Sequence, residues 1–319
     1  MTASMPHAEW LQHIGKEYLS TFIAEGGSAI KFAVPMDDAL RPAIFEGLAE
    51  LGDRSGYLVV NISAAETRVH MVDEIFFRAA EQIPWDILSR RVIAKLAAES
   101  GYSWVENAEG PLYRHIADRN HVDPQMLLLE LKKSIWDKVF KHPNLSKDFR
   151  VAMTHLCIAE LTGGQDWAAT IKVLTEWLTG RNKSLSAVKP FQIYRKINRA
   201  TGRYFFESLL QWVRLAGYPG IVIVLDTERV MAASNPHDDG LYYSKAAVMD
   251  AYEVLRQFID AGDQLKGCFI TVVPNFAFLE DHGRGIQAYE ALKFRVFDEV
   301  RDKQLVNPMA SLARIGAAI

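Results

Sequence analysis

The sequence predicts an α/β protein with a mostly parallel sheet and a large helical insertion. Continuous apolar runs, rather than alternating ones, predict strands that are buried on both faces, as in a parallel sheet covered by helices. Helical patterns lie between these runs, and one long stretch contains helical patterns alone. The composition is that of a globular protein, because 49% of the 319 residues are hydrophobic and 24% are charged. It excludes a disordered chain, a collagen-like fibre and a disulfide scaffold.

Four short segments rich in aliphatic and β-branched residues are predicted to be strands of one sheet. They are Ala29–Val34, Tyr57–Ile62, Gly220–Leu225 and Cys268–Val273. Amphipathic patterns predict helices over Asp37–Leu51, Tyr204–Ala216 and Lys245–Ala261. Strand–helix–strand units of this kind are nearly always right-handed. Because the strands are predicted to be buried on both faces, we expect helices on both faces of the sheet.

The stretch from about Val72 to Lys183 differs, because it is predicted to be helical throughout. Helices are expected over Gln125–Phe140, Val151–Leu161 and Ala168–Leu178, separated by turn residues. The first of these helices places five residues near one side, namely Met126, Leu129, Lys133, Trp136 and Phe140. We therefore expect a single domain over residues 1–319, with its core at 20–70 and 200–319 and an insertion at about 72–185.

Charge and cysteine content narrow the function classes. The net charge of −3 gives no overall attraction to nucleic acid or membrane, and Cys157 and Cys268 stand far apart. A structural zinc site is therefore not expected, and a reducing cytoplasm is the expected compartment. The N-terminal residues lack the pattern of a signal peptide. The longest aliphatic run, Ile221–Leu225, is too short to cross a bilayer, so we expect a cytoplasmic protein without a membrane partner.

The most informative segment is Gly220–Val230, which reads GIVIVLDTERV. An aliphatic strand that ends in an acid, with a second acid two residues later, is the pattern of a Walker-B strand. Asp226 is then the candidate ligand of Mg²⁺, and Glu228 is the candidate residue that orients an attacking water. The alternative is a buried strand that ends at an acidic loop. A metal-dependent nuclease is a weaker possibility, because no lysine is placed to complete its site.

Two long runs around this segment resemble the ATP-binding proteins of bacterial BREX phage-defence systems, the BrxD-like group. Arg199–Glu228 reads RATGRYFFESLLQWVRLAGYPGIVIVLDTE, and Ala251–Leu292 reads AYEVLRQFIDAGDQLKGCFITVVPNFAFLEDHGRGIQAYEAL. Gly26–Ser28 before the first strand and LTEWLTG at Leu174–Gly180 fit the same family. The resemblance spans most of the chain and is one of ordered motifs rather than of close identity.

The resemblance implies a P-loop NTPase fold of AAA+ type that binds ATP and Mg²⁺. It also implies self-assembly or assembly with other defence proteins, and work on double-stranded DNA. Asp226 and Thr227 would then contact the nucleotide, and Asn275 at the end of the next strand would sense the γ-phosphate. The alternative for Asn275 is a turn residue that follows a proline.

The sequence departs from this family after the first strand, where an active member has a glycine-rich loop ending in Gly-Lys-Ser/Thr. Val34–Arg41 reads VPMDDALR, without glycine or lysine. Asp37 and Asp38 would cap a helix well but repel a triphosphate, at about 4 kcal/mol for charges about 4 Å apart. Arg41 lies one helical turn on. We therefore expect a degenerate member that serves in assembly or DNA binding, with ATP and Mg²⁺ or no cofactor at all as the two options. The alternative is an active ATPase with a non-standard site that drives DNA-linked remodelling.

A second signal is a cluster of positive charge. Eight basic residues and Glu207 give residues 180–219 a local charge of +7, which leaves −10 for the rest of the chain. The candidate nucleic-acid contacts are Lys189, Arg195, Lys196, Arg199 and Arg203. Interleaved aromatic residues favour a phosphate-backbone surface; the alternatives are a solvated helix face, or Arg199 and Arg203 acting on a neighbouring subunit's nucleotide. Downstream, Arg284 and Arg295 are expected to pair with acids rather than to reach a phosphate.

Overall fold

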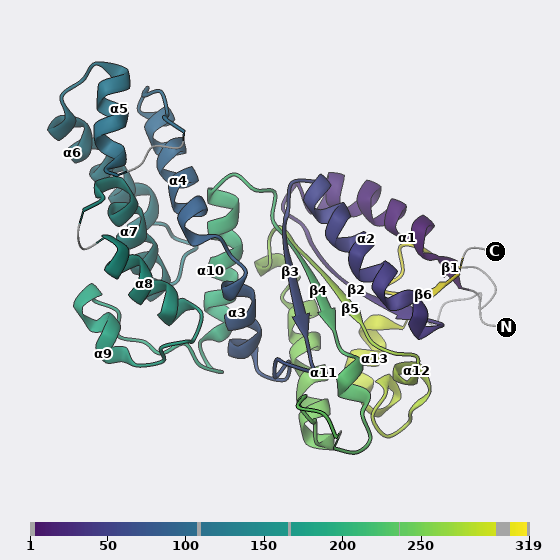
Figure 1. Ribbon diagram of the computed structural model, residues 1–319. Coiled ribbons are helices and arrows are strands. Elements are labelled where there is room, and N and C mark those ends of the chain that lie inside the picture. Colours follow the sequence, from purple (N-terminus) through teal and green to yellow (C-terminus); the bar gives the residue numbers. More distant parts are fainter. Residues whose placement is uncertain (1–3, 107–109, 165–166, 236, 298–306, 318–319) are drawn as a thin grey trace. The chain divides into compact units, whose positions relative to one another are not determined.

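The computed structural model describes residues 4–106, 110–164, 167–235, 237–297 and 307–317. Within them, six strands form one all-parallel sheet of order β1-β6-β2-β5-β4-β3 (Figure 1). The strands are β1 (Met5–Pro6), β2 (Ser28–Pro35), β3 (Leu58–Ser63), β4 (Ile221–Asp226), β5 (Cys268–Val273) and β6 (Leu312–Gly316). The four predicted strands are confirmed, and all lie in this one sheet. The two remaining strands, β1 and β6, were not predicted.

The chain divides into two compact units, and the sheet belongs to the first, which comprises Met1–Ala79 and Tyr218–Ile319. One face of the sheet is covered by α1 (His7–His13), the π-helix η1 (Ile14–Phe22) and α2 (Arg41–Arg54). Trp10, Ile14 and Leu48 from these helices pack with Val222 and Phe269 of the sheet, and all five are at most 1% exposed. Each large apolar side chain buried in this way contributes about 1.5–3 kcal/mol.

The other face is covered by α11 (Lys245–Asp260) and the short helix α12 (Ala277–Glu280). The ring of Phe278 in α12 stacks on that of Phe32 in β2, with centroids 5.6 Å apart. Tyr252 of α11 packs edge-on against Phe278 at 5.9 Å. Helices therefore lie on both faces, as predicted.

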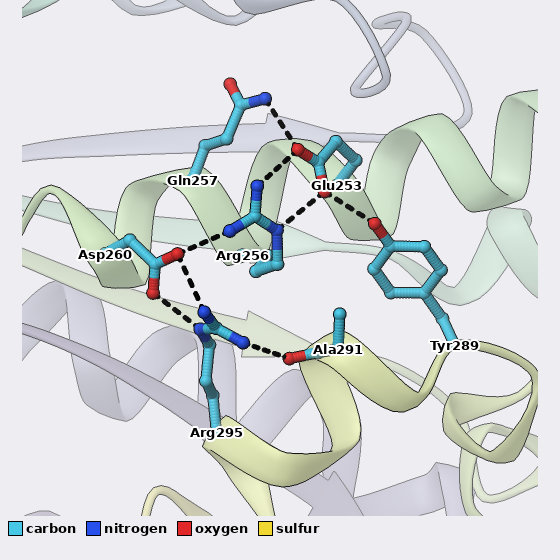
Figure 2. Close-up of polar contacts among 7 residues, drawn as sticks. All are labelled: Glu253, Arg256, Gln257, Asp260, Tyr289, Ala291 and Arg295. Carbon is cyan, nitrogen blue, oxygen red and sulfur yellow. Dashed lines mark hydrogen bonds and ion pairs between the residues drawn. The ribbon is translucent and has the colours of Figure 1, made fainter.

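A polar network joins α11 to α13 (Glu290–Val296) (Figure 2). Glu253 accepts two hydrogen bonds from Arg256, at 2.5 and 2.7 Å, and one from the hydroxyl of Tyr289 at 2.5 Å. Arg295 of α13 donates two hydrogen bonds to Asp260, at 2.5 and 3.0 Å. Arg256 holds the pKa of Glu253 at about 2, mainly through its hydrogen bonds to this carboxylate.

The second unit, Ala80–Gly217, consists of helices and connecting segments, with no strand among its described residues. Its helices are α4 (Trp85–Glu99), α5 (Leu112–Asn120), α6 (Pro124–Ile135), η3 (Trp136–Phe140), α7 (Lys147–Thr162), α8 (Trp167–Leu178), α9 (Leu185–Val188), η4 (Lys189–Phe191) and α10 (Gly202–Leu215). α3 (Val72–Glu81) leads into this unit. Helix α7 contacts α4, α5, α6 and α8, and eleven of its sixteen residues are buried. The helical stretch predicted over about Val72–Lys183 is therefore present.

The side of α6 that the sequence pattern singled out faces solvent. Met126 and Leu129 are 67% and 64% exposed, whereas Leu127, Leu131 and Ile135 form the buried face. Sequence spacing identifies an apolar stripe but not which of two stripes packs inward, and here the inward stripe is the purely aliphatic one. Within the described residues, no helix is both long and apolar enough to span a bilayer.

Candidate functional site at the carboxyl ends of the strands

The candidate acidic residues lie where the parallel strands end. Asp226 is the last residue of β4 and stands in register with Ser63 of β3 and Val273 of β5. Asn275 follows the end of β5 by two residues. The carboxyl ends of parallel strands meet at one edge of a sheet, the usual place for a ligand in an α/β fold. The topology therefore brings Asp226, Glu228 and Asn275 to the same edge.

Arg41, the first residue of α2, contacts both candidate acids. Its Nη2 donates to Asp226 Oδ1 at 2.5 Å, and its Nε lies 3.3 Å from Glu228 Oε2. Its Nη1 donates to the carbonyl oxygen of Pro274 at 2.8 Å. The side chain is 7% exposed, and the guanidinium lies 5.4 Å from the ring centroid of Phe45. One cation thus pairs with both acids at the end of β4 and also donates a hydrogen bond to the backbone after β5.

This contact corrects the sequence-based view of Arg41, which placed it one helical turn beyond the candidate site. The difference arises from the turn after β2. Residues Asp38–Leu40 form a 3₁₀ helix, capped by Asp37 Oδ1, which accepts from the amide of Ala39 at 2.9 Å. The α-helix then begins at Arg41, and this residue points back over the strand ends. Asp37 and Asp38 are exposed.

The loop after β4 is held by backbone hydrogen bonds. The amide of Glu228 donates to Asp226 Oδ1 at 3.0 Å, and the amide of Thr227 donates to Val273 O at 3.1 Å. Thr227 is 7% exposed, whereas the Glu228 side chain is 51% exposed. Of the two, therefore, only Glu228 presents its side chain to solvent.

A cavity of about 370 Å³ opens beside these residues. It is lined by Ser63, Ala65, Asp226, Glu228, Arg229, Met231, Ala232 and Asn275. The Oδ1 of Asn275 is buried and accepts no hydrogen bond from the described residues. Arg229 contacts Asp238 and donates to Leu241 O at 3.0 Å, so its charge is already paired. The cavity is therefore lined by two carboxylates that already pair with Arg41 and by the amide oxygen of Asn275, which can accept from a hydrogen-bond donor.

A family model described as BREX system ATP-binding protein BrxC/D matches residues 103–316, two thirds of the chain. The chain belongs to this family. The matched residues include β4, β5, Asp226, Glu228 and Asn275, whereas Arg41 and β2 precede them. No curated protein matches the chain, and no solved structure matches it. The parallel sheet is consistent with a P-loop NTPase-like fold, as the resemblance implied.

The described acids of this BrxC/D-family chain are not arranged as a metal site. Among the described residues there is no group of three or more histidine, cysteine, aspartate or glutamate side chains that could hold one. Asp226 and Glu228 are both engaged by Arg41. In this arrangement an ion such as Mg²⁺ could reach Asp226 Oδ1 only by displacing the guanidinium.

The five candidate nucleic-acid contacts lie in the second unit of the BrxC/D-family chain. Lys189 begins η4, Arg203 lies in the first turn of α10, and Arg195, Lys196 and Arg199 lie between them. The Nε of Arg203 donates to Glu207 Oε1 at 2.8 Å, the pairing expected of a helix-face arginine. Arg195, with a side chain 71% exposed, lies 3.9 Å from the buried Asp148.

Arg284 and Arg295 of the BrxC/D-family chain form hydrogen bonds and ion pairs that stabilise the fold. Arg295 pairs with Asp260, as predicted. Arg284 instead donates to the backbone carbonyls of Val230 and Tyr243, at 3.2 and 2.5 Å. Sequence reasoning missed Ser63 and Arg229 as residues that line the cavity. It also missed the contact of Arg41 with the two acids. The available signal was the position of Ser63 at the end of β3, of Arg229 shortly after β4, and of Arg41 at the start of the helix that follows β2.

Proposed function

We propose that this BREX-family chain is a degenerate member of its family that neither binds ATP with micromolar affinity nor hydrolyses it, because Arg41 pairs with both candidate catalytic acids. The observation that carries the proposal is the contact of this guanidinium with both Asp226 and Glu228. In an active site of this kind, one acid would hold Mg²⁺ and the other would orient the attacking water. With both engaged by an internal cation, neither role is filled.

The segment after β2 supports the same proposal. A phosphate site at a helix N-terminus relies on free backbone amides and on the positive end of the helix dipole. Here the amide of Ala39 is taken by Asp37, and Asp37 and Asp38 add two negative charges at that position. Asp226, Thr227 and Asn275 remain the candidate contacts for any nucleotide or Mg²⁺ that does bind.

We further propose that the chain acts as an assembly component of a multi-protein defence complex and binds DNA through its basic residues. The observation that favours DNA is the stretch 181–206, which contains seven basic residues and no acid. Binding through such a surface is independent of sequence and falls steeply with salt, because it releases counterions from phosphates. The assembly role is tested by pull-down from the native host, with and without Asp226→Asn and Glu228→Gln.

Calorimetry with ATP and Mg²⁺ tests the nucleotide proposal. We expect no micromolar binding by the unaltered chain. Micromolar binding that Asp226→Ala abolishes would contradict the proposal and favour the active ATPase with a non-standard site. Arg41→Ala serves as a second variant, because binding gained on its removal identifies the guanidinium as the group that blocks the site. DNA cleavage with Mn²⁺ in the absence of nucleotide would instead indicate a nuclease.

A further inference from the structure

The segment 192–204, between η4 and the first turn of α10, presents aromatic rings and positive charges together. Tyr194 and Tyr204 are 61% and 59% exposed, among the most exposed large side chains of the described residues. Arg195 and Lys196 directly follow Tyr194 and are exposed as well. No acid lies between Gln192 and Tyr204.

Buried side chains and backbone hydrogen bonds attach this segment to the rest of the second unit. The side chains of Ile193 and Ile197 are 0% and 7% exposed. The amides of Tyr194 and Arg195 both donate to Asp148 Oδ1, at 2.9 and 3.1 Å, and Asp148 is itself 5% exposed. The three residues between the two isoleucines must therefore project outward, and their backbone is held in place.

The end of the segment is fixed by a second set of hydrogen bonds. Asn198 Oδ1 accepts from the amides of Ala200 and Thr201, at 3.0 and 3.2 Å. The hydroxyl of Thr201 donates to Lys196 O at 2.8 Å, and α10 begins at the next residue. Tyr204 is thus carried by the first turn of a helix, and its backbone is ordered before any ligand arrives.

We infer that this segment binds single-stranded DNA, with Tyr194 and Tyr204 stacking on unpaired bases and Arg195 and Lys196 contacting phosphates. The inference rests on the DNA-binding part of the proposed function and names the form of DNA. Bases in a duplex are already stacked on one another, so an exposed ring gains little from them. An unpaired base has a free face, and stacking on it is tolerant of sequence. Duplex DNA would engage the cations alone.

Fluorescence anisotropy with a labelled oligothymidylate and with a mixed-sequence duplex of equal length tests this inference. We expect the single strand to bind more tightly. Tyr194→Ala and Tyr204→Ala should each weaken single-strand binding by about tenfold, within the range of one lost base stack, and leave duplex binding unchanged. Tyr194→Phe should retain binding, because the ring and not the hydroxyl makes the contact. Tyr242→Ala, at a tyrosine 42% exposed in the other unit, is the control and should have no effect.

The outcomes distinguish failure of the single-strand inference from failure of the DNA-binding proposal on which it rests. Equal binding of both DNA forms, unaffected by either tyrosine change but weakened by Arg195→Glu with Lys196→Glu, would overturn the single-strand inference and keep the DNA-binding proposal. Absence of binding to either DNA at low salt would overturn both. Melting temperatures of all variants, which should match that of the unaltered chain, show that the exposed tyrosines are not needed for folding.

Discussion

Arg41 is the residue on which the candidate site depends most. Its guanidinium joins the ends of β4 and β5, through Asp226 and Pro274, and it is almost fully buried. Removing one partner of a buried ion pair is costly, because the remaining charge loses its counter-ion without regaining full hydration. The site acids are therefore part of what stabilises the fold, whatever they bind.

We predict that Arg41→Ala lowers the free energy of unfolding by about 3 kcal/mol, the lower end of the cost of breaking a buried pair. The lower end applies because the Asp226 side chain is still 29% exposed. Urea unfolding measures the effect, and Arg54→Ala on the exposed end of the same helix is the matched control. If Asp226→Asn in the Arg41→Ala background restores no stability, the two residues are not coupled and this account of the site fails.

Lys31 is a second buried cation, in the middle of β2. Its amine donates to the carbonyl oxygens of Met309 and Ala310, at 2.6 and 3.0 Å, and lies 4.5 Å from the ring centroid of Tyr18. Burial lowers the pKa of this amine from 10.5 to about 8. The folded protein therefore loses this proton at a lower pH than the unfolded chain does.

The sign of the resulting pH dependence follows from proton binding. Between pH 8 and 10.5 the unfolded chain holds the Lys31 proton more tightly, so stability rises with pH in this window. We predict that the free energy of unfolding, relative to that of Lys31→Met, rises by about 3 kcal/mol between pH 7 and 10.5. Urea titrations of both proteins across this range measure it. A difference that stays constant or falls would show that Lys31 is not desolvated.

At the scale of elements, the network in Figure 2 is what ties α13 to α11 through polar groups. Glu253 has a pKa of about 2 in the folded protein against 4.5 ordinarily, because of its hydrogen bonds with Arg256. Its stabilisation is therefore complete above pH 4.5 and is lost as the pH falls from 4.5 to 2. Since its side chain is 32% exposed, solvent screens part of the effect.

We predict that Glu253→Gln lowers the melting temperature at pH 6, and that the difference from the unaltered chain vanishes near pH 2. Hydrogen exchange in α13 should rise in the same variant, because Tyr289, just before α13, loses its charged acceptor. Glu50→Gln, on the exposed face of α2, removes a charge without removing this network. A melting-temperature difference that persists at pH 2 would mean that the loss is one of packing rather than of charge.

β2, β4 and β5 could be predicted because each is a mainly apolar run in the interior of the sheet. β3 lies at the edge of the sheet, where Asn61 is exposed, and it was predictable from the apolar residues Leu58–Val60 rather than from burial on both faces. β6 could not be predicted, since Leu312–Gly316 includes an arginine and has no continuous apolar run. The acid pair was predictable from its place at the end of β4. The contact of Arg41 with it was not, because the 3₁₀ turn that sets the start of α2 depends on tertiary packing and not on local periodicity.

At the scale of the whole molecule, the chain combines a sheet-based unit with a helical one, and the BrxC/D family match covers parts of both. The acids at the strand ends lie in the first unit, and the basic segment lies in the second. These two features lead to separate predictions, because DNA binding by the segment requires nothing from the strand ends. We therefore expect Asp226→Asn with Glu228→Gln to leave DNA affinity unchanged in the same anisotropy titration, and a large loss would show that the two sites are coupled.

ATP hydrolysis tests the central claim most directly. Phosphate release is measured with excess ATP and Mg²⁺ for the unaltered chain and for the Asp226→Asn, Glu228→Gln double variant, purified identically so that any contaminating ATPase is shared. Because Arg41 engages both acids, we predict that the two proteins release phosphate at the same rate. Turnover by the unaltered chain that the double variant lacks would contradict the account and identify the chain as a working ATPase.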